Sequence, residues 1–567
     1  MAWCKPSLLA TFLLALISVL LRRKPQLKTI MKEANMNKPI KQSNPSHLVS
    51  GSSNPIAVVQ HPGQEQDGDR SGADFCRSAL PANRGLYYDG GWHEATSGRH
   101  LAVESPGTGE SLGEIADGDT TDIAAVVASA KTGFGIWRDV HPLERAAILR
   151  QVAEIVRKNA RELAAIDAID CGNPFTAMLN DAAIAASQLD FFAGFVTEMK
   201  GHSVPMGTGA INFSIREPLG VVAKIIPFNH PFMFASGKIA APLAAGNSVI
   251  VKPPEQAPLS TLRFAELIDG LLPSGVFNVA TGGREAGQAL TAHRDIAMLS
   301  VIGSVATGRA VMHAAADGLR PVLLELGGKN ALIAFADADP SVVADAMIAG
   351  MNFTWCGQSC GSTSRAFIHA AIYDAVLEHL RRGCSAIRPG LPTEPETRMG
   401  AICGRDHFER ILAMIETGRK DGARLLVGGG QSANPALANG FFIDPTVFVD
   451  VTPGMRIARE EIFGPVLSVL RWDDETAMVR TVNGLDYGLT CSVWTNDLAA
   501  ALRTASAVEA GYVWVNEVGR HFLGTPFGGY KQSGVGREEC LEELISYTQE
   551  KNIYIRLLPP SNAGNMA

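Results

Sequence analysis

The sequence predicts an α/β protein with two doubly wound α/β domains and an additional β-ribbon. With 567 residues, the chain is longer than one ordinary domain and should divide into two or more. Hydrophobic residues make up 46% and charged residues 19%, which is typical of a globular protein. From Gly220 onward, short apolar runs alternate with helical segments, and this alternation predicts parallel sheets covered by helices on both faces.

The charge and the cysteines exclude several classes of protein. Fifty basic against 57 acidic residues give 50 − 57 = −7, so no general basic field is available for nucleic acid or an anionic membrane. The nine cysteines form no C-x-x-C pair, and the spacing of Cys356 and Cys360 does not suit a structural zinc site. We therefore expect no disulfide framework, no metal, and a reducing, cytoplasmic location.

Residues 1–84 are predicted to lie outside the folded domains. Residues 8–21 are almost wholly apolar, but 14 residues are short for a membrane span, which takes about 20. Three interpretations stay open: a weak membrane anchor, a targeting segment, or sequence translated upstream of a real start at Met31 or Met36. Residues 36–83 are rich in polar residues, Pro and Gly and are expected to be disordered.

Hydrophobic periodicity predicts the elements of the first domain, which we assign to residues 85–200 and 217–326. Strands are expected at 86–92, 99–103, 221–226, 247–251, 276–280 and 296–302. Helices are expected at 119–132, 142–156, 160–170, 176–198, 231–244 and 259–272. The apolar stripes of these helices are interpreted as core.

A second α/β domain is assigned to residues 327–545. Its expected strands are 366–369, 466–472, 488–494 and 511–515, and its expected helices are 343–350, 372–382 and 499–507.

The segments 201–216 and 546–567 are interpreted as an oligomerisation ribbon and a C-terminal arm. Residues 201–216 and 551–557 alternate between apolar and polar residues, as edge strands do. Such a ribbon can leave the domain and pair with a neighbouring subunit, and the alternative is an edge hairpin within one chain.

Glu325 and Cys360 are the first candidate catalytic residues. An apolar run delivers Glu325 to a Gly-Gly turn, and 35 positions later Cys360 stands in a small, polar, glycine-flanked loop. A thiolate can attack a carbonyl group, and a carboxylate can then activate the water that releases the acyl group. The alternative is a buried acid and an inert buried thiol.

Seven motifs carry a resemblance to a known family. They are Pro227-Phe-Asn-His-Pro, Ala244-Ala-Gly-Asn-Ser-Val-Ile-Val-Lys-Pro-Pro-Glu-Gln, Gly303-Ser-x4-Arg309, Glu325-Leu-Gly-Gly-Lys, Gly357-Gln-Ser-Cys, Glu460-Glu-Ile-Phe-Gly-Pro465 and Pro526-Phe-Gly-Gly-Tyr-Lys-Gln-Ser-Gly534. With all seven in order, the chain from about Gly85 to Leu557 resembles the NAD(P)-dependent aldehyde dehydrogenase superfamily. The resemblance implies that the first domain is a Rossmann-like cofactor domain and the second is the catalytic domain.

The resemblance implies three catalytic roles. Cys360 would be the nucleophile, and Asn229 would stabilise the oxyanion together with the Cys360 backbone N–H. Glu325 would activate the water that hydrolyses the thioester. The alternatives are a helix cap for Asn229 and an ion pair with Lys329 for Glu325.

The resemblance also implies a dinucleotide site. Gly303, Ser304 and Gly308 would approach the pyrophosphate at a helix N-terminus. Further residues match positions that bind the cofactor: Lys252, Glu255, Glu461, Phe463, Pro227 and Phe228. A carboxylate at position 255 favours NAD because it repels the 2′-phosphate of NADP, while the positive charge of Lys252 leaves the use of NADP possible. The alternative is that Lys252 and Glu255 form a surface ion pair.

The substrate pocket departs from the common family pattern. Gly237, eight positions after Asn229, and Thr354, six before Cys360, stand where aromatic residues are common, which suggests room for a bulky or aromatic aldehyde. The matched positions that would line the mouth are His230, Trp355, Arg520, His521 and Phe527. Arg520 could instead hold a carboxylate of a semialdehyde, with plain solvent exposure as its alternative.

The expected function is oxidation of a small-molecule aldehyde to its acid with NAD, in a homodimer or homotetramer. A semialdehyde or betaine-aldehyde-type dehydrogenase, a CoA-acylating dehydrogenase and an inactive binding protein are the alternatives. Membrane association is expected only through residues 8–21.

Overall fold

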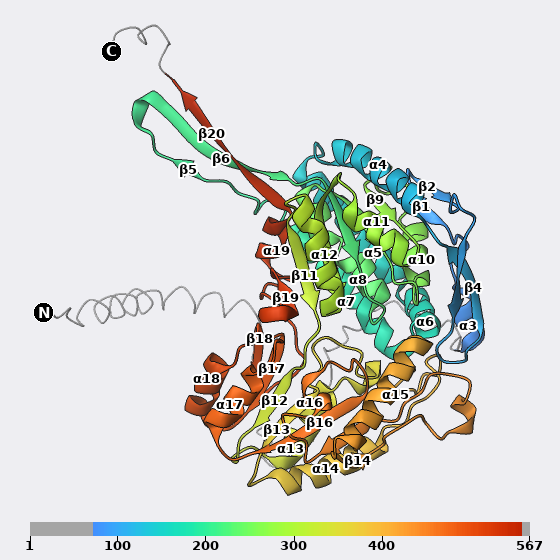
Figure 1. The fold of residues 1–567 in the computed structure, drawn as a ribbon. Coiled ribbons are helices and arrows are strands. Elements are labelled where there is room, and N and C mark those ends of the chain that lie inside the picture. Colours follow the sequence, from blue (N-terminus) through green and yellow to red (C-terminus); the bar gives the residue numbers. More distant parts are fainter. Residues whose placement is uncertain (1–71, 558–567) are drawn as a thin grey trace, which may run out of the picture. The chain divides into compact units, whose positions relative to one another are not determined.

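The computed structural model describes residues 72–557 (Figure 1). The chain separates into the units Met1–Gly68 and Asp69–Ala567, and the described residues belong to the second. The apolar segment 8–21 and the prediction made for it lie outside the described residues. Within residues 72–557, no helix is long and apolar enough to cross a membrane.

The described chain begins with a helix, α3 (Ala73–Ser78), inside the segment that was expected to be disordered. That expectation is wrong for this stretch. Cys76 of α3 is 1% exposed, and Phe75 and Leu80 pack against the core of the first domain. Burial of a few apolar residues on an existing core stabilises a short helix that composition alone does not predict.

An eight-stranded sheet forms the first domain, in the order β19-β11-β10-β7-β8-β9-β1-β2. Its strands are β1 (Leu86–Tyr88), β2 (Gly91–His93), β7 (Val221–Ile225), β8 (Ser248–Lys252), β9 (Phe277–Val279), β10 (Ile296–Gly303), β11 (Val322–Leu326) and β19 (Gly534–Val535). The five strands β7 to β11 run parallel, as their apolar sequences predict. A separate two-stranded sheet pairs β3 (His100–Glu104) with β4 (Ser111–Ala116).

The helices of this domain are α4 (Thr120–Trp137), α5 (Pro142–Lys158), α6 (Ala160–Asp170), α7 (Phe175–Gly194), α8 (Pro231–Gly237), α9 (Ala240–Ala245), α10 (Leu259–Leu267), α11 (Arg284–Ala292) and α12 (Val305–Asp317). The expected single helix 231–244 is divided into α8 and α9. Pro242 has no N–H to donate to the carbonyl of Lys238, four residues earlier, and its ring crowds that carbonyl.

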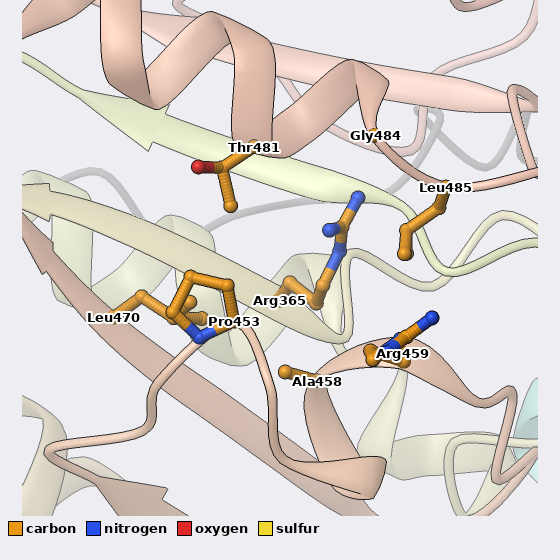
Figure 2. Close-up of a pocket in the computed structure, with 8 residues that line it drawn as sticks. All are labelled: Arg365, Pro453, Ala458, Arg459, Leu470, Thr481, Gly484 and Leu485. Carbon is orange, nitrogen blue, oxygen red and sulfur yellow. The ribbon is translucent and has the colours of Figure 1, made fainter.

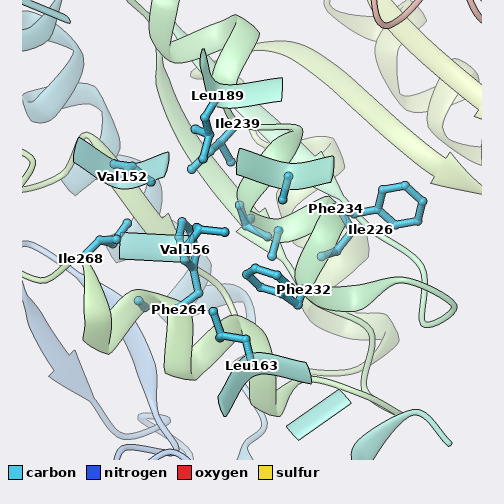
Figure 3. Packing of buried hydrophobic residues seen from close by; sticks show 14 of the residues in the cluster. Val152, Val156, Leu163, Leu189, Ile226, Phe232, Phe234, Ile239, Phe264 and Ile268 are labelled. Atoms are coloured by element: carbon cyan, nitrogen blue, oxygen red, sulfur yellow. The ribbon is translucent and has the colours of Figure 1, made fainter. Parts of the chain in front are cut away.

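Helices α5, α6, α8 and α10 share one apolar core (Figure 3). Phe232 of α8 lies edge-on to Phe264 of α10, with ring centroids 6.4 Å apart. Figure 3 shows Phe232 among Val156, Leu163 and Phe264, whereas Phe234 points to the other side of its helix. This core holds α8 firmly, and α8 directly follows the loop that carries Asn229.

A seven-stranded sheet forms the second domain, in the order β14-β15-β16-β13-β12-β17-β18. Its strands are β12 (Ala331–Ala334), β13 (Arg365–His369), β14 (Arg424–Val427), β15 (Thr446–Val449), β16 (Val466–Trp472), β17 (Thr490–Trp494) and β18 (Tyr512–Val515). Its helices are α13 (Pro340–Gly350), α14 (Tyr373–Ala386), α15 (Arg405–Lys420), α16 (Arg456–Arg459), α17 (Glu475–Asn483) and α18 (Leu498–Ala507). The two sheets, whose central strands run parallel, confirm with their helices the predicted α/β class.

The chain passes from one sheet to the other through Gly327–Asn330, between β11 and β12. It returns near its end, because β19 pairs antiparallel with β11. β19 lies inside residues 327–545, so that segment contributes to both sheets. The proposed domain boundaries otherwise remain a prediction.

A three-stranded ribbon contains β5 (Ser203–Val204), β6 (Ala210–Pro218) and β20 (Thr548–Arg556). β20 pairs with β6 of its own chain along its whole length, from Thr548↔Pro218 to Arg556↔Ala210. Pairing with a neighbouring subunit and pairing within one chain were both left open for these segments, and here the C-terminal strand completes the ribbon of its own chain. In Figure 1, β6 and β20 extend away from the helices of the first domain.

Candidate active site

Glu325 and Asn229 both lie at the carboxyl edge of the first sheet. Glu325 is close to the end of β11, in register with Ile302 of β10. On the other side of β10, strand β7 ends at Ile225 and leads into the loop that carries Asn229. Ligands of doubly wound sheets bind beside the carboxyl ends of the strands, so both residues are where a ligand is expected.

A tight loop of the second domain presents Cys360. The 3-10 helix η2 (Phe353–Trp355) is flanked by Asn352 and Cys356, both in the left-handed region with φ of 55°. The Asn330 side chain donates a hydrogen bond to the Cys360 carbonyl oxygen at 2.6 Å. Among the cysteines of residues 72–557, only Cys360 is not buried. A partly exposed cysteine on a braced loop suits a nucleophile.

Glu325 and Cys360 influence each other's protonation directly. Burial and the charge of Glu538 raise the pKa of Glu325 to about 8, although hydrogen bonding with Cys360 works in the opposite direction. Burial, the charge of Glu325 and the hydrogen bond between them raise the pKa of the Cys360 thiol well above its ordinary value. A carboxyl group with a pKa near neutrality, beside a thiol, is suited to general-base catalysis.

Asn229 is 4% exposed and is not a helix cap. His230 occupies the N-cap position of α8, without a capping side-chain hydrogen bond. Asn173 donates to the Asn229 carbonyl oxygen at 2.7 Å, and Asn229 Oδ1 has no hydrogen-bond partner among residues 72–557. Next to it, the ring of His230 lies 5.3 Å from that of Trp355, centroid to centroid. The Asn229 loop and the Cys360 loop therefore meet.

An ion pair between Glu325 and Lys329, the alternative for Glu325, is not formed. Glu325 Oε1 and Lys329 Nζ both lack a hydrogen-bond partner in the described part of the chain. Burial and the charge of Arg365 lower the pKa of Lys329 to about 7. Glu325 therefore keeps an uncommitted carboxylate oxygen facing its surroundings.

Glu461 fits against the Gly-Gly turn that follows Glu325. The backbone N–H of Gly328 donates to Glu461 Oε1 at 3.0 Å. A Cβ atom at Gly327 would lie 1.9 Å from Glu461 Oε2, so any other residue at position 327 would have to displace this carboxylate. Burial raises the pKa of Glu461 to about 7.

A buried ion pair behind Glu325 was missed by the sequence analysis. Lys238 Nζ lies 2.9 Å from Glu538 and 3.7 Å from Glu539, and all three side chains are almost fully buried. These charges act on Glu325, because Glu538 raises its pKa and Lys238 lowers it. The signal in the sequence was Lys238 itself, the only charged residue in the apolar stretch 231–245, because a buried charge requires a partner.

Lys252, Glu255 and Ser304 of the predicted cofactor site lie at the carboxyl edge of the first sheet. Lys252 ends β8 and is 6% exposed, with its Nζ donating to the Pro253 carbonyl at 3.1 Å, and the exposed Glu255 follows it. Ser304 caps α12 by accepting from the N–H of Thr307 at 3.1 Å. An exposed helix N-terminus, a lysine and a carboxylate at one sheet edge fit a dinucleotide.

The glycines near α12 fulfil different requirements. A Cβ at Gly308 would lie 2.4 Å from Leu326 Cδ1, so this glycine lets α12 pack closely on β11. At Gly303 an added Cβ meets nothing closer than 3.8 Å, which leaves open space over the strand end.

Aromatic rings from both domains meet beside the site. The ring centroid of Phe228 lies 5.9 Å from that of Phe463 and 5.6 Å from that of His407. Pro227 and Phe228 follow β7, while Phe463 belongs to the second domain and adopts φ of 54°. The predicted cofactor residues Phe228 and Phe463 are thus brought together from separate parts of the chain.

The space expected beside Gly237 is filled. A Cβ at Gly237 would lie 2.1 Å from Gln188 Oε1, so the Gln188 side chain from α7 occupies this space. His230, seven residues before Gly237, donates a hydrogen bond from Nδ1 to Asp181 Oδ2 at 2.7 Å. Thr354 lies partly exposed in η2. Polar residues of α7, which no sequence motif identified, therefore fill the space beside Gly237 and contact His230.

The other predicted pocket residues form a second group. The ring of His521 lies 4.5 Å from that of the buried Phe527, and its Nδ1 is 3.2 Å from Glu539 Oε2. Because Glu539 also contacts Lys238, this group adjoins the end of α8. Arg520 is exposed and lies over the ring of Phe522 at 4.8 Å, as its alternative interpretation expected.

A cavity of about 300 Å³ lies elsewhere in the second domain (Figure 2). It is lined by Arg365, Pro453, Ala458, Arg459, Leu470, Thr481, Gly484 and Leu485, none of which is a predicted site residue. Arg365 donates to the carbonyl oxygens of Lys329 and Val482, which ties the start of β13 to its neighbours.

Comparison with known proteins agrees with this geometry. Residues 92–553 match the aldehyde dehydrogenase family. The chain is 48% identical over 497 residues to aldehyde dehydrogenase tropH of Talaromyces stipitatus, covering 86% of this chain and 96% of that protein. It is 39% identical over 485 residues to hydroxyisobutyraldehyde dehydrogenase of Mycolicibacterium austroafricanum, covering 85% and 96%.

A solved structure extends the agreement to the cofactor. The NAD+ complex of aldehyde dehydrogenase from Bacillus cereus superimposes with a TM-score of 0.81 at 35% sequence identity, covering 84% of this chain and 97% of that one. The chain described here therefore belongs to the aldehyde dehydrogenase family and is an NAD-dependent oxidoreductase that acts on aldehydes.

Proposed function

We propose that the chain oxidises its aldehyde to a carboxylic acid through a thioester on Cys360, which is hydrolysed by water that Glu325 activates. The observation that carries this proposal is the proximity of the buried Glu325 carboxyl and the thiol of the partly exposed Cys360 at the carboxyl edge of the first sheet. In the first step, the Cys360 thiol gives up its proton to water, and the thiolate attacks the carbonyl carbon. The Asn229 amide and the Cys360 N–H donate hydrogen bonds to the oxyanion, where one donor is worth about 3 kcal/mol.

The second half of the cycle belongs to Glu325. After oxidation of the thiohemiacetal, the acyl group remains on Cys360 as a thioester. Glu325 takes a proton from water, the hydroxide adds to the thioester carbon, and the thiolate leaves with the carboxylic acid as product. Glu325 lies on a strand of the first domain and Cys360 on a loop of the second, and in the acyl-enzyme the attacking water would lie between them.

The residues at the sheet edge fit the dinucleotide. Lys252 and Glu255 would hold the adenosine ribose, and the N-terminus of α12 with Ser304 would hold the pyrophosphate. Glu461, fixed by Gly328, would hold the nicotinamide ribose. NAD bound there supplies the acceptor for the hydride that leaves the substrate carbon. The exposed carboxylate of Glu255 favours NAD over NADP.

Single-turnover kinetics test the two chemical roles separately. Holoenzyme with Glu325→Gln should release one equivalent of NADH in a burst and then stop, because acylation needs Cys360 and deacylation needs the base. Cys360→Ser should remove the burst while NAD still quenches tryptophan fluorescence. If Glu325→Gln turned over continuously at the wild-type rate, the assignment of Glu325 would be refuted.

The CoA-acylating and inactive alternatives are less well supported. Transfer of the acyl group to CoA needs no base at position 325, yet Glu325 is buried beside Cys360 with a pKa of about 8. An inactive binding protein would not need a partly exposed cysteine, a buried oxyanion amide and this base together. NADH formation that depended on added CoA would reverse the choice.

The ribbon is proposed to join subunits into a homodimer or homotetramer. β5 and β20 form its two edges, and its exposed apolar side chains include Val204, Ile211, Ile215, Tyr554 and Ile555. Exposed apolar residues on a sheet with free edges are typical of a protein interface.

We propose a cytoplasmic location. The described cysteines are free thiols, which suits a reducing compartment. A fusion to a fluorescent protein would test this, and a membrane-bound signal lost on deletion of residues 8–21 would refute it.

A further inference from the structure

The cavity of Figure 2 is not used by the proposed reaction, and its lining contains two arginines. Arg365 comes from the start of β13 and Arg459 from the end of α16. The rest of the lining is apolar or small: Pro453, Ala458, Leu470, Thr481, Gly484 and Leu485. Figure 2 shows the guanidinium group of Arg365 directed toward Gly484 and Leu485. A concave, mostly apolar wall with a few placed polar groups is typical of a small-molecule site.

Arg365 carries a buried charge that no carboxylate balances. The residue is 4% exposed, and it donates from Nε to the Lys329 carbonyl oxygen at 2.8 Å and from Nη2 to the Val482 carbonyl oxygen at 3.3 Å. Its Nη1 has no hydrogen-bond partner among residues 72–557. Burial lowers the pKa of Arg365 to about 10, and the group that opposes this effect is the thiol of Cys491. Buried charges are normally paired, so this guanidinium group is suited to bind an anion.

Arg459 is the second charged group of the lining, and it is exposed. It forms no ion pair within the described part of the chain, because the carboxylate next to it is already bound. Nε and Nη2 of Arg456 donate to the two carboxylate oxygens of Glu460 at 2.7 and 2.8 Å. The cavity therefore has one arginine on its solvent side and another in its interior.

The surroundings of Arg365 add positive charge to the cavity. Lys329 Nζ is buried without a hydrogen-bond partner in the described chain, and burial and the charge of Arg365 lower the pKa of Lys329 to about 7. Glu461 and Glu460 oppose this effect. However, Glu460 is bound by Arg456, and burial raises the pKa of Glu461 to about 7, so Glu461 is only partly charged at neutral pH. An anion in the cavity would reduce the remaining repulsion.

We propose that this cavity binds a small organic carboxylate, with its head group between Arg365 and Arg459 and its short apolar body against Leu470 and Leu485. Nη1 of Arg365 and the guanidinium group of Arg459 offer charge-assisted donors to the two carboxylate oxygens. The volume of about 300 Å³ and the apolar wall suit an organic ligand better than a bare inorganic anion. A phosphate monoester would bring a third charged oxygen, and the lining contains no third basic side chain.

Isothermal titration calorimetry of the full chain, saturated with NAD, measures this binding. Benzoate has a carboxylate head and an apolar body, whereas benzamide keeps the shape without the charge and inorganic phosphate has no apolar body. We expect benzoate to bind at least about tenfold more tightly than either, because hydrogen bonds between charged partners are the stronger ones. Phenyl phosphate tests the choice of head group and should bind no more tightly than benzoate.

Three variants test whether the arginine pair and the volume of the cavity determine the affinity. Arg459→Met removes one guanidinium group but keeps a long side chain, so the affinity for benzoate should fall about tenfold. Ala458→Leu keeps both arginines but places a larger side chain in the cavity, and it should also weaken binding. Arg480→Met is the matched control, because Arg480 is an exposed arginine of α17 that does not line the cavity, and it should keep the wild-type affinity.

A crystal soaked with 4-bromobenzoate locates the ligand without any variant, through the anomalous signal of its bromine. We expect this signal in the cavity beside Arg365 and Arg459. Bromine found only near Cys360, or no bound bromine, would overturn the proposal. So would an affinity for benzoate that Arg459→Met and Ala458→Leu both leave unchanged, or benzamide binding as tightly as benzoate. Tighter binding of either phosphate than of benzoate would exclude a carboxylate as the class of ligand.

Discussion

The protonation of Glu325 should control the rate of deacylation between pH 7 and pH 9. The groups that act on this carboxyl are Cys360, Glu538, Lys238 and Glu461, and their effects together with burial raise its pKa to about 8. A general base works only as the carboxylate, so activity falls as the pH drops through the pKa. About one molecule in eleven carries the carboxylate at pH 7 and about ten in eleven at pH 9, a rise of about tenfold.

Stopped-flow measurement of NADH separates this step from acylation. The steady-state rate after the burst should rise about tenfold from pH 7 to pH 9, with an inflection near pH 8. Glu538→Gln removes the charge that raises the Glu325 pKa, so the inflection should move to lower pH. Lys238→Met removes a charge that lowers it and should move the inflection to higher pH. A flat profile from pH 6 to pH 9, or shifts in the opposite directions, would refute the reasoning.

Three further predictions concern the site and the ribbon. Glu325→Gln should raise the free energy of unfolding at pH 7 by up to roughly 3 kcal/mol in denaturant titrations, because the folded carboxyl keeps its proton from pH 4.5 to about 8 while the unfolded one loses it; the gain should vanish below pH 4.5. Asn229→Ala should lower the burst rate by about 10² to 10³ with NAD affinity unchanged in a fluorescence titration. Ile211→Asp combined with Tyr554→Asp should reduce the mass measured by light scattering, and an unchanged mass would exclude the ribbon as the interface.

Part of the strands and helices could be predicted from the sequence because their signals are local, whereas elements such as β4, β12, β14, β15 and α15 were not predicted. The apolar run Val221–Ile226 and the periodic helix 142–156 are found within one or two residues of their expected bounds. The division of α8 from α9 was also a local effect, since Pro242 stands in the sequence and blocks the carbonyl of Lys238. The prediction followed the apolar periodicity of residues 231–244 and did not divide the helix at Pro242.

The rest of the site depends on contacts between distant segments. Gly237 by itself was interpreted as a sign of open space. The side chain that fills this space belongs to Gln188, 49 positions earlier, and a single glycine does not indicate that contact. The ion pair of Lys238 with Glu538 joins residues 300 positions apart. Helix α3 forms only because a core built by later residues is available to it. Such pairings follow from the fold and have no signature in any window of sequence.

The short crossover Gly327–Asn330 makes catalysis depend on how the two sheets are docked. The base and the oxyanion amide are carried by the first sheet, whereas the nucleophile is carried by a loop of the second. A slight loosening of one against the other would separate sulfur from carboxylate before a single strand was lost. Catalytic activity should therefore be lost at a lower denaturant concentration than the circular dichroism signal. The rate of turnover is then the more sensitive measure of how the two sheets are docked.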